Sequence, residues 1–314
     1  MITIFNDPTI TFPLFGEGFS LDIPRFFTIF GFNIYYYGLF ITLGYATASF
    51  YLIKRGDLFG LKTDNILDLL LITVPCGIVG ARIYYMLFNF DSFFAPGQWG
   101  NILAFRDGGL AVYGGIIASM LVFIIYSRVK KIPLGNLFDA GGFALLIGQA
   151  IGRWGNFVNR EAFGAETELP WKMGLTFNTD KMMNGVFYNR GVTYYFHPTF
   201  LYESLWCGLG FLLMHIFSKK SHTKYPGQYF LFYVVWYGFG RFMIEGLRMD
   251  SLFIPGTDFR ASQWLAAISC ITAIGLLIYN HFRIRNKTGD IEAVINKYVK
   301  EPNDTPKEEK ADKS

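Results

Sequence analysis

Charged side chains interrupt the long apolar stretches of this sequence, and they are the first candidates for chemistry. An ionisable group inside a membrane-spanning helix costs on the order of 3 kcal/mol, so it is expected to have a functional or structural partner. If each apolar stretch spans a bilayer, all but one of these groups lie toward the same membrane face, which predicts a single polar site. The set is Arg82, Asp139, Arg153, Glu203, Arg241, Glu245 and Arg248, and Asp139 is the exception.

The spacing of these groups places several of them on shared helix faces. Arg241 and Glu245 are four positions apart, and Arg248 follows three positions later, so the three can form a ladder. Arg153 and Asn156 are three positions apart and also share a face. The planar guanidinium fork suits bidentate contact with phosphate. Salt bridges that only hold helices together would explain any one residue, but three arginines near one face exceed what packing requires.

Small residues recur every three or four positions through residues 148–156, GQAIGRWGN. Such residues let helices approach closely, and they also let the backbone approach a ligand. Helix packing alone would explain the glycines. It does not explain the polar residues beside them, Arg153, Asn156, Asn159 and Glu161.

Composition sets the class of protein. Of the 314 residues, 52% are hydrophobic and 17% are charged, whereas soluble domains have about a quarter charged residues. Aromatic residues reach 19%, and aromatic side chains are frequent at membrane–water interfaces. These values predict an all-α integral membrane protein. The net charge of +4 is then expected to reflect cytoplasmic loops, not nucleic-acid binding.

About seven stretches approach the roughly 20 apolar residues that a membrane helix needs. Basic clusters follow the first, third, fifth and seventh of them, which predicts an N-terminus outside and a C-terminus in the cytoplasm. The stretches are 33–53, 68–88, 110–127, 138–157, 199–217, 228–245 and 261–282.

The spans divide the chain into three regions. Residues 1–32 are expected to form an extracytoplasmic interfacial segment, and residues 33–282 a seven-helix transmembrane catalytic domain. Within that domain, residues 158–198 are long enough to form an outer cap or loop. Residues 283–314 are rich in Lys and Glu and are expected to be a cytoplasmic, largely disordered tail.

Several motifs resemble those of the bacterial prolipoprotein diacylglyceryl transferases. The most specific is GRWGNFVNREAFG at residues 152–164, because it is long and mixed in chemistry. The resemblance extends over roughly residues 35–262. The other motifs are YYGL at 36–39, GARI at 80–83, DGG through YGG at 107–115, HP with LYE at 197–203, and RF with Glu245 and Arg248.

The resemblance implies a function, a location and substrates. Members of the family transfer the diacylglyceryl group of phosphatidylglycerol to the lipobox cysteine thiol in the signal peptide of a prolipoprotein. A thioether forms and glycerol 1-phosphate leaves, as the first step of bacterial lipoprotein maturation. The implied location is the bacterial plasma (inner) membrane, with the active site toward the extracytoplasmic face. No metal or organic cofactor is implied, and no nucleic-acid partner.

The resemblance, together with residue chemistry, assigns roles to the site residues. The expected catalytic residues are Arg153, Asn156, Arg241, Glu245, Tyr113 and Tyr37. The expected phosphatidylglycerol-binding residues are Arg153, Arg82, Arg248, Glu161, Gly164, His197 and Glu203. Arg153 and Arg241 would hold the phosphate, and Glu245 would orient Arg241. Some family members have His where this chain has Tyr113, so a mechanism with that His as general base cannot be transferred unchanged.

A multi-helix transporter of a small anionic or lipid-like substrate is the alternative interpretation. Transporters place polar residues near the bilayer midplane and often show internal repeats, whereas these charges lie near one face and no repeat is visible. A retinal-type sensor would need a Schiff-base lysine, which residues 261–282 lack. A metal-dependent phosphotransferase would need clustered carboxylates, and the carboxylates here are scattered.

Overall fold

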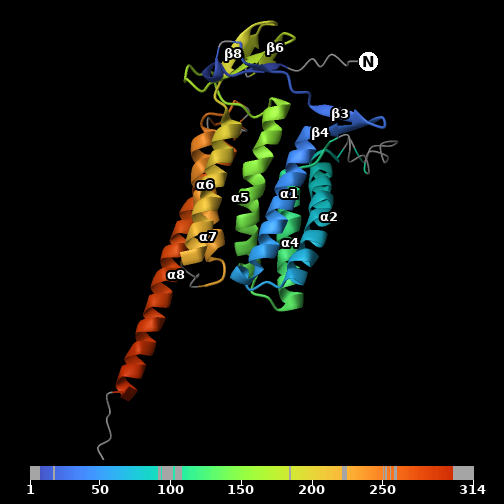
Figure 1. The fold of residues 1–314 in the computed structure, drawn as a ribbon. Helices are drawn as coiled ribbons and strands as arrows, with labels where there is room; N and C mark the ends of the chain where they lie inside the picture. The colour runs from blue at the N-terminus through green and yellow to red at the C-terminus, as the bar shows by residue number, and fades with distance from the viewer. Residues whose placement is uncertain are drawn as a thin grey trace, which may run out of the picture.

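The computed structural model describes residues 8–16, 18–90, 93, 102, 108–183, 185–220, 225–249, 251, 253–254, 256–257 and 260–299. Seven long helices run through this part of the chain, and they gather into one bundle (Figure 1). Their bounds are α1 Tyr36–Arg55, α2 Thr63–Phe88, α4 Val112–Lys130, α5 Leu134–Asn159, α6 Thr199–Lys220, α7 Gln228–Glu245 and α8 Ala261–Val299.

Each predicted apolar stretch overlaps one of these helices, although the first begins within β4, so apolar composition and length were sufficient to find the helices. Five helices, α2, α4, α5, α6 and α8, are long and apolar enough to cross a membrane. The described protein is therefore a mostly helical, multi-pass membrane protein.

Short strands correct the expectation of an all-helical chain. A four-stranded antiparallel sheet has the order β2-β1-β5-β8, and two separate hairpins pair β3 with β4 and β6 with β7. The bounds are β1 Thr9–Thr11, β2 Ser20–Leu21, β3 Phe26–Ile29, β4 Phe32–Tyr35, β5 Met173–Thr176, β6 Lys181–Met183, β7 Val186–Tyr188 and β8 Thr193–Phe196. These segments are rich in β-branched and aromatic residues, which favour strands.

The sheet joins two predicted regions that are far apart in the sequence. Strand β1, from the N-terminal segment, pairs with β5 of the predicted cap, with Ile10 opposite Leu175. Both side chains are fully buried, and they pack in one apolar cluster with Phe157 at the end of α5. Figure 1 shows the strands at one end of the helix bundle. Strands β1 and β2 of the N-terminal segment thus form one sheet with strands β5 and β8 of the predicted cap.

Helix α5 lies at the centre of the bundle, in contact with α1, α6 and α7, and α2 packs mainly on α4. Glycines allow these close approaches. A Cβ atom added to Gly44 of α1 would lie 3.3 Å from the Gly148 Cα atom of α5. One added to Gly80 of α2 would lie 2.7 Å from the Gly114 carbonyl oxygen of α4. The small residues beside the charged groups therefore do serve helix packing.

Asp139, the one charge predicted at the opposite face, has a structural partner. Its buried carboxylate accepts hydrogen bonds from the backbone N–H groups of Gly227 and Phe230, each at 2.8 Å. These groups belong to the first turn of α7, whose leading N–H groups have no partner within the helix. Asp139 therefore caps α7 from a neighbouring helix and contributes nothing to the polar site.

The end of the chain differs from the disordered tail expected for residues 283–314. Helix α8 continues to Val299, so residues 283–299 are helical and extend beyond the bundle (Figure 1). The sequence allows this length. Gly289 costs a helix only about 1 kcal/mol, and the first proline after Arg260 is Pro302. Residues 300–314 lie outside the described part of the chain.

Candidate active site

Glu203 of α6 lies at the centre of the polar residues. Its Oε2 atom lies 2.5 Å from Arg153 Nη2 of α5, and its Oε1 atom lies 3.0 Å from Arg241 Nη1 of α7. Arg248, just after α7, places Nη1 3.4 Å from the same Oε1 atom. The glutamate side chain is only 5% exposed, so these charge-assisted contacts form in a largely water-free setting. One carboxylate therefore joins three arginines, from α5, from α7 and from the segment that follows α7.

A second carboxylate, that of Glu245 in α7, supports Arg241. Glu245 Oε2 lies 2.5 Å from Arg241 Nη2, one helix turn away, as the spacing predicted. The Arg260 guanidinium donates to the Glu245 backbone carbonyl and lies over the Phe253 ring, 5.6 Å from its centroid. Sequence reasoning missed Arg260. The available signal was a further arginine in the predicted outer loop, beside the four outer-face arginines already identified.

Arg153 also begins a hydrogen-bonded chain toward the cap. Its Nη1 atom donates to Asn156 Oδ1 at 3.3 Å, and Asn156 Nδ2 donates to Glu161 Oε1 at 2.8 Å. Asn159 Nδ2 donates to the same Glu161 oxygen at 3.3 Å. The Tyr37 ring lies against this segment, since a Cβ added to Gly155 would be 2.6 Å from Tyr37 Cδ2. The structure thus brings these predicted residues together around the end of α5.

Gly164 and His197 join the cap to the end of α7. Gly164 N–H donates to the His197 carbonyl at 2.9 Å, and Ala165 N–H donates to the Leu247 carbonyl at 2.7 Å. The His197 ring lies 3.2 Å from the Tyr202 hydroxyl through Nδ1, and burial lowers the pKa of His197. A lowered pKa favours the neutral imidazole, which suits a hydrogen-bonding role. Both residues hold the backbone next to Arg248.

Replacing Gly164 with alanine is expected to damage this junction. The added Cβ would lie 2.7 Å from His197 Cβ and 3.0 Å from the Leu247 carbonyl oxygen. Overpacking of this kind costs about 1–3 kcal/mol, so thermal unfolding should occur at lower temperature and transfer activity should fall. Gly275→Ala is the control, because nothing lies within 4 Å of its Cβ position. Equal thermal stability of the two variants would contradict this role for Gly164.

Two predicted residues, Arg82 and Tyr113, lie on the α2–α4 pair. Arg82 is buried and donates to the carbonyls of Gly108 at 2.6 Å, Gly109 at 3.1 Å and Ile102 at 3.2 Å. It therefore holds the segment that enters α4. The exposed Tyr113 has its ring 6.5 Å from that of Tyr84. Asp107 of the same motif lies outside the described residues.

An apolar groove opens beside the polar residues. It has a volume of about 590 Å³ and runs between α1 and α6 over α5. Trp154 and Ser204 line it, and they follow Arg153 and Glu203 directly in sequence. Trp154 Nε1 donates to Ser204 Oγ at 3.2 Å, which ties the two helices at this point. The remaining lining is Phe40, Leu43, Ala150, Ile151, Leu205, Gly208, Leu209 and Leu212.

The formal charges of the polar network leave one positive charge in excess. Three guanidinium groups meet two carboxylates around Glu203. Arg260 and Glu161, the next charged groups bonded to this network, cancel each other and leave the excess unchanged. Among the described residues, no group of three or more His, Cys, Asp and Glu could hold a metal ion. The arrangement suits an anionic ligand with an apolar portion.

Fold and site together define a multi-pass membrane protein with an arginine-rich site beside an apolar groove. The sequence pattern of the family described as prolipoprotein diacylglyceryl transferase matches residues 24–279. The chain belongs to this family, and it is therefore a transferase.

Curated relatives agree with this assignment. A protein from Listeria welshimeri is 41% identical over 252 residues, which is 80% of this chain and 87% of that protein. Similar proteins occur in Enterococcus faecalis, 39% identical over 80% of this chain and 88% of the relative, and in Streptococcus pneumoniae, 41% identical over 79% and 90%. All three are named phosphatidylglycerol–prolipoprotein diacylglyceryl transferase.

Proposed function

We propose that this protein transfers the diacylglyceryl group of phosphatidylglycerol to the lipobox cysteine of prolipoproteins, forming a thioether and releasing glycerol 1-phosphate. The names of its relatives support the two substrates. The observation that carries the proposal in this chain is the Glu203 network. It gathers Arg153, Arg241 and Arg248 with one excess positive charge, which matches the single negative charge of a phosphodiester.

In this mechanism the phosphate of phosphatidylglycerol binds to the forks of Arg153 and Arg241. The cysteine sulfur attacks the terminal glyceryl carbon, the S–C bond forms, and the C–O bond to the phosphate breaks. The leaving phosphate gains negative charge, and fixed guanidinium groups stabilise that charge most where water is excluded. Asn156 and Glu161 hold Arg153 from the cap side, and Glu245 holds Arg241.

The thiol must lose its proton during the attack. Its ordinary pKa is about 8.5, so only modest help is needed, and a tyrosine with a pKa near 10 is a weak acceptor. Of the two tyrosine candidates, Tyr37 lies against the Arg153 segment, whereas Tyr113 lies on the α2–α4 pair. The geometry therefore favours Tyr37 over Tyr113 as the hydrogen-bond partner of the reacting thiol.

The acyl chains of phosphatidylglycerol would lie in the groove lined by Phe40, Leu43 and Leu209. This groove is open to the surface between α1 and α6, so a lipid can reach the arginines from the side. With seven spans and the basic clusters in the cytoplasm, the arginines and the cap of residues 158–198 face the extracytoplasmic side of the bacterial inner membrane. Residues 1–32 would lie on that side as well.

The test mixes the purified protein, phosphatidylglycerol and a lipobox peptide, and follows peptide mass and glycerol phosphate release. We expect the peptide to gain one diacylglyceryl group, and a peptide with Ser in place of Cys to gain none. No adduct from protein shown to be folded would overturn the proposal. Uptake of an anionic solute by vesicles that contain the protein would then favour the transporter.

A further inference from the structure

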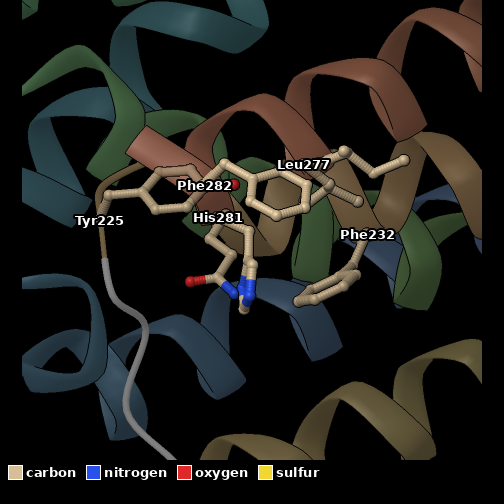
Figure 2. Close-up of a pocket in the computed structure, with 7 residues that line it drawn as sticks. Tyr225, Phe232, Leu277, His281 and Phe282 are labelled. Atoms are coloured by element: carbon tan, nitrogen blue, oxygen red, sulfur yellow. The ribbon is translucent and has the colours of Figure 1, made fainter. Parts of the chain in front are cut away.

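A second apolar groove lies at the end of the bundle opposite Glu203. It has a volume of about 410 Å³ and lies between the start of α7 and the middle of α8. Figure 2 shows Tyr225, Phe232, His281 and Phe282 among the side chains that line it. Leu277 and Ile278 complete the α8 side, and Gln228 adds an amide. The catalytic proposal uses none of these residues.

The groove lies at the depth of a lipid head group. Helix α8 begins at Ala261, near the arginine-rich end, and reaches His281 twenty residues later. At 1.5 Å per residue this is about 30 Å, the thickness of the hydrocarbon core of a bilayer. Phe232, Ile278 and Phe282 are 42%, 52% and 53% exposed, so they face the surrounding lipid. The apolar lining of the groove therefore ends at the depth where the phosphate groups of the bilayer lipids begin.

Two arginines, Arg283 and Arg285, lie just after the groove residues of α8, and helix geometry places them on different faces of the helix. Leu277, Ile278 and His281 line the groove, and Arg285 lies four positions after His281 and seven after Ile278. At 100° per residue, Arg285 falls on the same face, one turn beyond the apolar lining. Arg283 falls on the opposite face. Both side chains are exposed. Because only Arg285 shares the face of the groove, Arg285 is the member of this pair that can contact a ligand there.

We propose that this groove binds an anionic phospholipid of the leaflet that meets the basic helix ends, with its phosphate at His281 and Arg285. Its acyl chain lies against Phe232, Leu277 and Ile278, and the polar Gln228 and His281 face the head group. The carboxylate of Asp139, which acts electrostatically on Tyr225 of the groove, accepts hydrogen bonds from the backbone amides of Gly227 and Phe230. The site is separate from the transfer reaction, and its lipid is not consumed.

The test measures binding of phosphatidic acid to the full chain, by native mass spectrometry and by the shift in thermal unfolding temperature. Phosphatidic acid is anionic but lacks the second glycerol of phosphatidylglycerol. Arg285→Gln should weaken its apparent affinity about fivefold, the effect of about 1 kcal/mol per basic residue near an anionic leaflet. Arg283→Gln makes the same charge change on the other face and should change the affinity less than twofold.

A second pair of variants tests the groove itself. Ile278→Trp fills it and should reduce both binding and thermal stabilisation, whereas Leu276→Trp, at a 44% exposed position on the opposite face, should leave both unchanged. Equal losses in the two arginine variants would mean diffuse attraction to basic charge and would overturn the proposal. Equal affinity for phosphatidylcholine would also overturn it. Because the measurement is binding and not transfer, its outcome is independent of the catalytic proposal.

Discussion

Arg153→Ala is expected to reduce diacylglyceryl transfer at least about 100-fold while the protein stays folded in the membrane. The guanidinium contacts Glu203 Oε2 at 2.5 Å and Asn156 Oδ1 at 3.3 Å, so both partners aim its fork at one place. Loss of one preorganised donor to a developing charge costs about 10²–10³ in rate. Glu203 keeps Arg241 and Arg248 after this change, which preserves folding. The measurement is peptide lipidation at saturating lipid.

Two further variants separate geometry from charge. Arg153→Lys keeps the positive charge but loses the planar fork, so it should recover only a small part of the transfer rate. Arg128→Ala is the control. It removes an exposed arginine in the last turn of α4, away from Glu203, and should leave the transfer rate unchanged. Near-normal transfer by Arg153→Ala, or full activity of Arg153→Lys, would show that the fork of Arg153 does not hold the phosphate.

Glu203→Gln is expected to lower both stability and transfer. The carboxylate is 5% exposed and contacts three guanidinium groups, so its neutralisation removes the counter-charge that the three share. Removing one partner of a buried ion pair costs about 3–5 kcal/mol. We expect the low end, about 3 kcal/mol, because the three arginine side chains are 11–20% exposed. Thermal unfolding in detergent should shift down by about 6 °C or more.

Matched changes in the same network distinguish this role from simple packing. Glu161→Gln alters an exposed carboxylate that accepts hydrogen bonds from the amides of Asn156 and Asn159, so its stability loss should be small. Glu203→Gln combined with Arg241→Gln removes one charge of each sign and should recover part of the stability without restoring transfer. If the double variant is no more stable than Glu203→Gln, charge balance around Glu203 is not what stabilises the bundle.

Tyr113 lies on a different pair of helices from the arginines that contact Glu203. Its motif resembles that of family members in which a histidine occupies the same place, and on that basis Tyr113 was a catalytic candidate. In the fold it lies on α4 beside Tyr84, while Tyr37 lies against the segment that carries Arg153. Helices α2 and α4 pack mainly on each other, so a motif on this pair can be similar in sequence without touching Glu203.

The helices and the family could be read from the amino acids alone. Hydropathy and helix propensity add up over neighbouring residues, so a stretch such as 68–88 predicts its own helix without knowledge of its partners. The Arg241–Glu245 contact is of the same local kind, because a four-residue spacing sets it. The signature at residues 152–164 identified the family for a similar reason, since its information lies in one continuous segment.

Long-range pairing decided the rest, and no local pattern encodes it. Glu203 was one charge among seven in the sequence, and only the packing of α5, α6 and α7 made it the common partner of three arginines. Strand β1 has its partner β5 more than 160 residues away, so the sheet in the cap was invisible to periodicity. Arg82 and Asp139 have the same chemistry as the residues around Glu203. In the fold, however, Arg82 donates to the backbone carbonyl of Gly108, and Asp139 accepts from the backbone N–H of Gly227.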